Sequence, residues 1–254
     1  MPCDEEIARS YEKWLQSPTG YYVDWREKEL IVDLLSPGNG ETLLDVGCKT
    51  GHHLLFFRRK GCDVAGIDSS PRMLEIAKRK LGERADFYKG SGEDLPFSDN
   101  EFDIVTVTSL GCAGDPRRVI GEALRVCKNR IFLGGFNRYA LASSQRQGHE
   151  PVYRHIEGHS ASLGIYKLYS MLKEVHTGEA VRWGSVISFP LGWYPFVSFL
   201  EERIPAVKNP FGSFLGMTAP AIYTHMTIQE PLRDKLKLTV GKEQHEPVTR
   251  EMKK

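Results

Sequence analysis

Two acidic side chains and a glycine turn have the spacing that could bind a nucleoside. The stretch LLDVGCKTGHHLLFF, from residue 43, reads as a strand, a tight turn containing Gly47 and Gly51, and a helix. Asp45 ends that strand, and Asp68 ends the next predicted strand, DVAGID. Glycines at such a turn let a ligand approach the backbone without a Cβ in the way. We therefore expect Asp68 to accept hydrogen bonds from both hydroxyls of a ribose.

The glycine spacing separates two kinds of nucleoside ligand. A dinucleotide fingerprint is G-x-G-x-x-G, but Lys49 holds the middle of this turn and His52 occupies the third glycine's place. That spacing disfavours a nicotinamide cofactor. A carboxylate at Asp45 suits a ligand with a cationic ammonium and sulfonium, because opposite charges attract strongly in a partly dry cleft. An alternative role for Asp68 is to cap the helix that Ser69 and the following residues begin.

The elements that must position these residues alternate along the chain. Strands separated by helices of this length predict a parallel, doubly wound α/β sheet. A helical segment, residues 4–36, precedes the sheet; it has a break at 17–20, and its second helix is expected from about Asp24 to Leu35. We expect strands at 42–46, 63–68, 85–90, 102–109 and 130–136, and helices through about 60 and at 71–81 and 116–127. Beyond Asn137 the pattern predicts a helix at 161–175, a strand at 179–190, an aromatic insertion at 191–213 and a last strand at 214–224.

A third motif, GSGEDLPFSDNEFDIV at residues 90–105, follows the third predicted strand. With the first two motifs it makes residues 42 to about 137 resemble the class I S-adenosylmethionine-dependent methyltransferases, and more narrowly their methyltransferase type 11 branch. The resemblance implies a Rossmann-like, seven-stranded sheet of order 3-2-1-4-5-7-6 with the last strand antiparallel, an N-terminal helical lid and an insertion before the last strand. It implies one domain over 1–224, made of a lid (1–36), a cofactor-binding core (42–137) and an acceptor-side half (138–224), before a charged tail (225–254) that we expect to be mobile.

S-adenosyl-L-methionine is the cofactor that the resemblance implies. The family's loop after the third strand has an acid where Ser91 stands, so the adenine amine contact would be weaker or carried by Glu93. Leu95 and Phe97 are expected to pack beneath this loop. The residues expected to bind the cofactor are Asp45, Gly47, Cys48, Gly51, Asp68, Ser69, Ser91, Gly92, Glu93 and Ser109.

Methyl transfer from a sulfonium is an in-line displacement, for which the protein aligns the reactants, excludes water and removes a proton where the acceptor carries one. The catalytic residues are unknown; the candidates are Tyr11 and Tyr22 in the lid and His149 and His155 beyond the core. The aromatic residues of 189–214 could form an apolar acceptor pocket, a lid core or a dimer surface. We expect a small, partly apolar acceptor. The alternative is a catalytically silent regulatory protein that keeps the fold and the cofactor.

The composition of the chain indicates which partners, cell location and metal or disulfide sites to expect. The formal charge of +1 gives no reason to expect a nucleic-acid partner. No apolar run approaches the roughly 20 residues of a membrane span, and the N-terminus lacks the apolar core of a signal peptide. Five cysteines without a C-x-x-C pair predict neither a metal site nor a disulfide framework. We expect a cytoplasmic protein with a small-molecule acceptor, and a homodimer is compatible with the sequence.

Overall fold

The computed structural model describes residues 2–140, 163–176, 180–190 and 193–221. Residues Met1–Ile222 form one compact unit, and the remainder, Tyr223–Lys254, is a separate unit outside the described residues. The predicted charged tail therefore lies outside them as well. Within the described ranges, no helix combines the length and the apolar composition that a membrane crossing requires.

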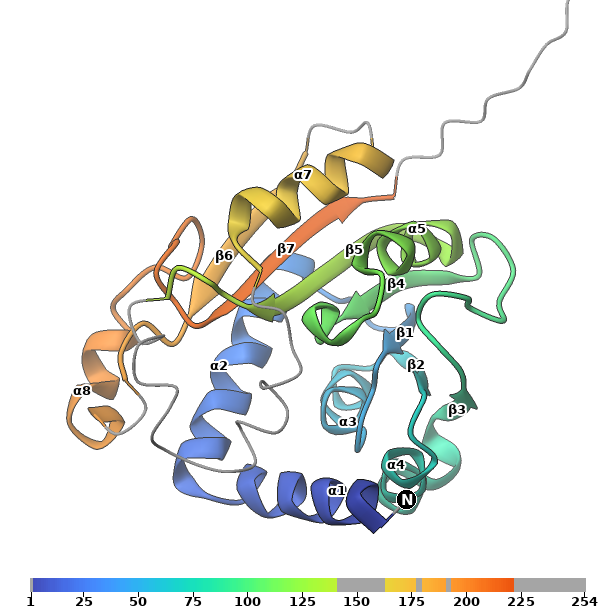
Figure 1. Cartoon of the computed structure of the whole chain (residues 1–254), viewed down its shortest axis with the longest axis horizontal. Helices are drawn as coiled ribbons and strands as arrows, with labels where there is room; N and C mark the ends of the chain where they lie inside the picture. Colours follow the sequence, from blue (N-terminus) through green and yellow to red (C-terminus); the bar gives the residue numbers. More distant parts are fainter. Residues whose placement is uncertain (1, 141–162, 177–179, 191–192, 222–254) are drawn as a thin grey trace, which may run out of the picture. The chain divides into compact units, whose positions relative to one another are not determined.

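A seven-stranded sheet organises the compact unit, in the order β3-β2-β1-β4-β5-β7-β6 (Figure 1). The predicted strand order is confirmed, and the last strand, β7, runs antiparallel to both of its neighbours. The strands are β1 (Thr42–Val46), β2 (Asp63–Asp68), β3 (Asp86–Lys89), β4 (Phe102–Val107), β5 (Cys127–Phe136), β6 (Arg182–Val186) and β7 (Phe214–Pro220). The helices are α1 (Pro2–Leu15), α2 (Pro18–Leu35), α3 (His52–Arg59), α4 (Pro71–Leu81), α5 (Pro116–Val126), α7 (Ile165–Val175) and α8 (Tyr194–Glu201), with short 3-10 turns η1 (Gly82–Arg84) and η2 (Leu110–Cys112).

Strand β1 lies between β2 and β4 and is parallel to both. Val46, its last residue, pairs with Ile67 on one side and Val107 on the other. Alternate strand residues point to opposite faces, and each face of the sheet has its own apolar core. The turn that follows β1 is consequently placed between the carboxyl ends of β2 and β4, where ligands of such sheets bind.

Helix α2 begins earlier than the sequence predicted. The segment from Ser17, read as a break before a helix at about Asp24, is a helix start: Ser17 Oγ accepts a hydrogen bond from Gly20 N at 3.0 Å, and Pro18 takes the first helical position. A missing N–H at that position costs nothing, so proline starts the helix instead of breaking it. At the other end, Arg130 Nε donates to Leu35 O at 2.7 Å, beside the start of β5. The N-terminal end of α2 therefore points towards the carboxyl edge of the sheet.

Candidate functional site

A cleft of about 300 Å³ lies at the carboxyl ends of β1, β2 and β4. Besides predicted residues it is lined by Lys49 and by apolar side chains that sequence reasoning missed, among them Ile67 and Val107. The signal for these was available, because each stands at or just beyond the carboxyl end of a parallel strand. Leu110, in the loop after β4, lines the cleft as well. Seven of the ten predicted cofactor-binding residues line the cleft: Gly47, Asp68, Ser69, Ser91, Gly92, Glu93 and Ser109.

Asp68 is fixed in the cleft by two backbone groups. Its Oδ2 accepts a hydrogen bond from Lys49 N at 2.9 Å, and its Oδ1 accepts one from Ser70 N at 2.8 Å. The cap of α4 is Ser70, whose Oγ accepts from Met73 N at 3.3 Å. Each oxygen of a carboxylate accepts two hydrogen bonds, so Asp68 keeps capacity for a ligand. The ribose contact of Asp68 stays a prediction that this placement permits.

In the turn after β1, every second residue lies in the left-handed region: Gly47 has φ +73°, Lys49 +49° and Gly51 +74°. A Cβ on Gly47 would meet only Ser109 Cβ, at 4.0 Å, and would otherwise stand in open space within the cleft. A Cβ on Gly51 would lie 3.0 Å from Leu81 Cδ1, which is on α4. Gly47 thus leaves room for a ligand, whereas Gly51 lets the turn pack against α4 and does not line the cleft.

Asp45 and Cys48 are buried and do not line the cleft. Asp45 Oδ1 accepts a hydrogen bond from Thr106 Oγ1 at 2.7 Å. Burial raises the pKa of Asp45 to about 7, although the Thr106 hydroxyl and the charge of Lys49 act in the opposite direction. Burial also raises the pKa of the Cys48 thiol. Both side chains are therefore packed within the protein. Their contact with a cofactor stays a prediction.

Two side chains of α5 hold the loop after β3 in place through hydrogen bonds to its backbone. Arg125 donates to the carbonyl oxygens of Phe97 and Leu95, at 2.8 and 3.0 Å, and Glu122 accepts from Leu95 N at 2.9 Å. Leu95 and Phe97 are buried in the core, as the sequence predicted. Glu93, which also faces the cleft, accepts from Asp115 N at 2.8 Å.

Ser109, directly after β4 (Phe102–Val107) and Thr108, carries a buried hydroxyl that has no hydrogen-bond partner among the described residues. A buried hydroxyl without a partner costs about 1–3 kcal/mol. Ser109 lines the same cleft as Asp68 and Gly47, so a polar ligand bound there would supply the missing partner. The Asp68 carboxylate, the unpaired Ser109 hydroxyl and the open backbone at Gly47 together fit a ligand that has ribose hydroxyls and amino-acid polar groups.

The two lid tyrosines are poor bases at neutral pH. Burial raises the pKa of Tyr11 well above its usual value, and the carboxylates Glu27 and Asp24 raise it further. Lys49 Nζ lies 5.5 Å from the centre of the Tyr11 ring, so this side chain is drawn to the lid and not simply solvated. Burial also raises the pKa of Tyr22 to about 12. The other two candidates, His149 and His155, lie outside the described residues.

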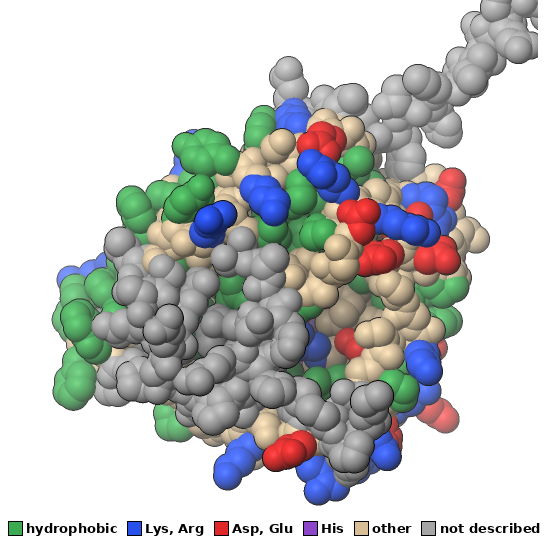
Figure 2. Space-filling model, in the orientation of Figure 1, with side chains coloured by type: hydrophobic (Ala, Val, Ile, Leu, Met, Phe, Trp, Pro, Cys, Tyr) green, Lys and Arg blue, Asp and Glu red, His purple; other side chains and the backbone are tan. Residues whose placement is uncertain are grey.

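The described aromatic residues of the insertion differ in their exposure to solvent. Tyr194 and Phe214 are buried, but Trp193, Phe196 and Phe199 are exposed, and hydrophobic side chains gather at the position of α8 in Figure 2. Of the three expected roles, an acceptor pocket and a lid core thus fit the buried residues only. The exposed ones form a surface.

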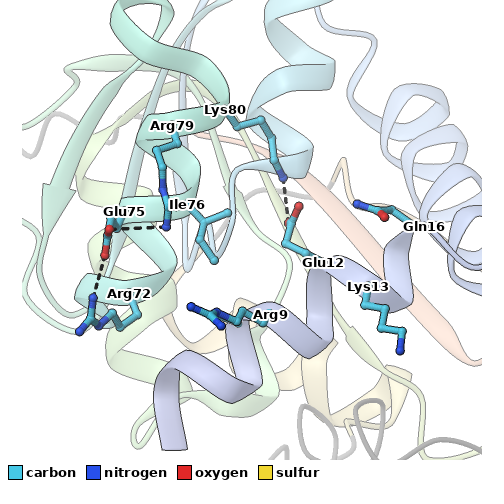
Figure 3. A pocket seen from close by; sticks show the side chains of 10 residues that line it. Arg9, Glu12, Lys13, Gln16, Arg72, Glu75, Ile76, Arg79 and Lys80 are labelled. Atoms are coloured by element: carbon cyan, nitrogen blue, oxygen red, sulfur yellow. Dashed lines mark hydrogen bonds and ion pairs between the residues drawn. The ribbon is translucent and has the colours of Figure 1, made fainter. Parts of the chain in front are cut away.

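A second, larger hollow of about 680 Å³ lies between α1 and α4 (Figure 3). None of the predicted cofactor-binding residues lines it. Glu75 pairs with Arg72 at 3.0 Å and with Arg79 at 3.5 Å, and Lys80 of α4 reaches Glu12 of α1 at 2.9 Å. This groove is a charged surface at which the Lys80–Glu12 ion pair links α1 to α4.

Comparisons with known proteins found similarity to methyltransferases. Residues 44–133 match the family model described as "Methyltransferase domain". A demethylmenaquinone methyltransferase of Thermotoga maritima is 33% identical over 129 residues, which cover 50% of this chain and 56% of that protein. A second protein of that name, from Renibacterium salmoninarum, is 36% identical over 104 residues, covering 41% and 44%. The chain thus spans about half the length of the curated relatives it matches.

Solved structures share the fold at low sequence identity. A S-adenosylmethionine-dependent methyltransferase of Thermotoga maritima, described as a possible histamine N-methyltransferase, is 19% identical with a TM-score of 0.69, covering 86% of this chain and 98% of that one. We conclude that residues 44–133 match a methyltransferase domain, and that the strand order is that of a fold shared with solved S-adenosylmethionine-dependent methyltransferases.

Proposed function

We propose that this protein transfers a methyl group from S-adenosylmethionine to a small, partly apolar molecule by in-line displacement. The observation that carries the proposal is the cleft at the ends of β1, β2 and β4, where the Asp68 carboxylate and the unpaired Ser109 hydroxyl stand on opposite sides of the Gly47 turn. Bound S-adenosylmethionine supplies a sulfonium whose methyl group is electrophilic.

The chain's own residues would bind and orient that cofactor. Asp68 would accept hydrogen bonds from the ribose, because its carboxylate is already aimed by Lys49 N and Ser70 N. Ser109 Oγ would gain the partner it lacks. The apolar strand-end residues, such as Val107 and Leu110, would keep water from the reacting atoms. In this proposal alignment and exclusion of water supply the catalysis.

The class of acceptor is inferred from the pKa values of Tyr11 and Tyr22 and from the names of the relatives. With pKa values raised above 10, Tyr11 and Tyr22 stay protonated near pH 7 and cannot remove a proton there. The acceptor would then be a group that is already ionised at neutral pH, such as a carboxylate, or a quinol or phenol whose proton is removed by a group other than these two tyrosines. The names of two relatives, both demethylmenaquinone methyltransferases, support a small, apolar acceptor.

Two measurements test this proposal. Isothermal titration calorimetry measures binding of S-adenosylmethionine to the purified chain, and a radiolabel assay measures methyl transfer to a panel of acceptors. We expect cofactor binding and transfer to at least one of a short-chain quinol, a phenol or a carboxylate. Transfer to peptides or nucleic acids alone would overturn the acceptor class. Absence of cofactor binding would overturn the whole proposal.

A cofactor-binding protein that transfers no methyl group is the second candidate. Lys49, which replaces a glycine of the turn after β1, and Ser91, which replaces the acid of the loop after β3, are the features that give it weight. The same two measurements separate the candidates. Binding of S-adenosylmethionine without turnover of any panel member would support the silent protein.

A further inference from the structure

Lys49 is a strained residue inside the cleft. Of the described non-glycine residues with positive φ, Lys49 is the one that lines the cleft, and its φ is +49°. A glycine adopts this conformation without steric cost, whereas a residue with a Cβ is strained there. Residues that keep such strain gather at ligand-binding sites, where the surrounding structure holds them in place. The conformation and position of Lys49 therefore indicate a ligand contact for its side chain.

The ammonium of Lys49 is also the positive charge of the cleft. Among the described residues that line it, Lys49 is the one basic residue, whereas Asp68 and Glu93 are acidic. An anionic group of a ligand is repelled by both carboxylates and attracted by the ammonium. The charges of the cleft thus offer an anionic group one favourable position, next to Lys49 Nζ.

This ammonium keeps capacity for a ligand. Within the described ranges it forms no ion pair, and its contact is the ring of Tyr11 on α1, whose centre lies 5.5 Å from Nζ. The Lys49 charge lowers the pKa of Asp45, but burial acts more strongly and raises that pKa to about 7, so much of Asp45 is protonated at neutral pH. An aromatic ring attracts a cation more weakly than a hydrogen-bonded carboxylate does. A carboxylate brought by a ligand would therefore be the stronger partner.

We propose that Lys49 binds the carboxylate of the methionine part of S-adenosylmethionine. This inference rests on the proposed function, which makes S-adenosylmethionine the ligand of the cleft. The carboxylate is the anionic group of that molecule, whose sulfonium and ammonium are cationic. Hydrogen bonds between an ammonium and a carboxylate are charge-assisted and among the strong ones. Lys49 would consequently select S-adenosylmethionine against related nucleosides without a carboxylate, and it would bind that group beside α1, where Tyr11 lies.

Calorimetric titration with two ligands tests this role of Lys49. They are S-adenosylmethionine and decarboxylated S-adenosylmethionine, which lacks the carboxylate but keeps the sulfonium and the ammonium. We expect the wild type to bind the decarboxylated ligand roughly ten- to hundredfold more weakly, the factor that a hydrogen bond between charged groups supplies. In Lys49→Met the affinity for S-adenosylmethionine should fall by that factor. The affinity of this variant for the decarboxylated ligand should not fall, because the Lys49 charge repels its two cationic groups.

Lys60→Met is the matched control. Lys60 follows α3, is exposed and does not line the cleft, and its Nζ lies 5.6 Å from the centre of the Phe56 ring, so it repeats the contact of Lys49 with an aromatic ring. This variant should leave both affinities unchanged. Lys49→Arg keeps the positive charge and should still discriminate between the two ligands. Lys49→Gly removes the strain together with the ammonium and should lose the discrimination, as Lys49→Met does. Denaturant unfolding checks that each variant is folded.

Four results would overturn the role of Lys49. The first two are equal affinities of the wild type for the two ligands and an unchanged affinity of Lys49→Met for S-adenosylmethionine. The third is an equal loss for both ligands in Lys49→Met, which would assign the residue to the shape of the turn. The fourth is tighter binding of S-adenosylmethionine by Lys49→Gly, which would mean that the lysine side chain obstructs the cleft. Wild-type protein that binds neither ligand would overturn the proposed function as well.

Discussion

The Asp68 carboxylate accepts a hydrogen bond from the backbone N–H of Lys49, with 2.9 Å between Oδ2 and N. The residue predicted to hold the ribose therefore also holds the turn that borders the cleft. Lys49 is in the left-handed region at φ +49°, where a residue with a side chain is strained by roughly 1–2 kcal/mol. The bond to Asp68 helps to keep it there, so ligand binding and turn geometry depend on one side chain.

Replacing Asp68 should impair both properties. In Asp68→Asn an amide N–H₂ or a single oxygen must face two backbone donors, and we expect S-adenosylmethionine affinity to fall at least about tenfold. The free energy of unfolding should fall by about 1–3 kcal/mol. Asp63→Asn is the control, because Asp63 stands at the other end of β2 and its ion-pair partner among the described residues is the exposed Arg58, at 3.0 Å. Calorimetric titration and denaturant unfolding measure the two quantities, and equal effects of both substitutions would contradict this role.

The two glycines of the turn should respond differently to alanine. Both have positive φ, so both variants carry a strain of roughly 1 kcal/mol. In Gly51→Ala the new Cβ also crowds Leu81, at 3.0 Å, and Ala77, so we expect the larger loss of stability there. In Gly47→Ala the Cβ enters the cleft, so we expect the larger loss of cofactor affinity. Thermal unfolding and cofactor titration of both variants check this, and the reverse ranking would show that the glycine roles are exchanged.

Ser109→Ala should weaken cofactor binding without destabilising the protein. The hydroxyl has no partner among the described residues, so its removal relieves an unpaired buried group and the free energy of unfolding should stay equal or rise by up to about 1 kcal/mol. Loss of one hydrogen bond to the ligand should raise the dissociation constant roughly two- to tenfold. Ser98→Ala, on the exposed part of the loop after β3, is the control and should change neither quantity. A destabilised Ser109→Ala with normal affinity would mean that the hydroxyl has a partner within the protein.

Asp45 should make the unliganded protein less stable as pH rises. Burial raises the pKa of Asp45 from 3.8 to about 7, so between these values the folded protein holds a proton that the unfolded chain has released. Stability contributed by this group is present below about pH 4 and is lost as pH rises towards 7, by an amount on the order of 4 kcal/mol. In Asp45→Asn this fall should disappear, as measured by denaturant unfolding across that range.

Asp103 provides the opposite case on the neighbouring strand β4. Its Oδ2 accepts hydrogen bonds from Thr42 N and Thr42 Oγ1, both at 3.0 Å, and the bond from the Thr42 backbone lowers the pKa of Asp103 most. This stability is present at neutral pH and is lost as pH falls through the lowered pKa. Asp103→Asn should therefore destabilise the protein at pH 7, whereas Asp45→Asn should not. If both variants were destabilised at pH 7, the argument that burial raises the pKa of Asp45 would be contradicted.

The parts of the fold and site that the sequence predicted are those with local signals. Proline after a capping serine marks the start of α4 at Pro71, and alternating strands and helices lead to the strand order. Seven predicted residues reach the cleft because the carboxyl ends of parallel strands meet at one edge. The start of α2 was missed because the same proline and glycine residues can break a helix or begin one, and only the hydrogen bond to Ser17 Oγ distinguishes the two.

What the sequence could not predict depends on three-dimensional packing. That Gly51 faces α4 while Gly47 faces the cleft follows from contacts with Leu81 and Ser109, which are far away in the chain. The burial of Asp45 beside Thr106 likewise needs the register of β1 with β4. The orientation of α8 was ambiguous because its residues are apolar on nearly every side, so no periodicity separates an inward from an outward face.

The most direct test is calorimetric titration of the wild-type chain and Asp68→Asn with S-adenosylmethionine under identical conditions. The cleft described above predicts a single saturable site in the wild type and an affinity at least about tenfold lower in the variant. Wild-type protein that binds no S-adenosylmethionine, or a variant that binds it as tightly, would contradict the assignment of this cleft as the cofactor site.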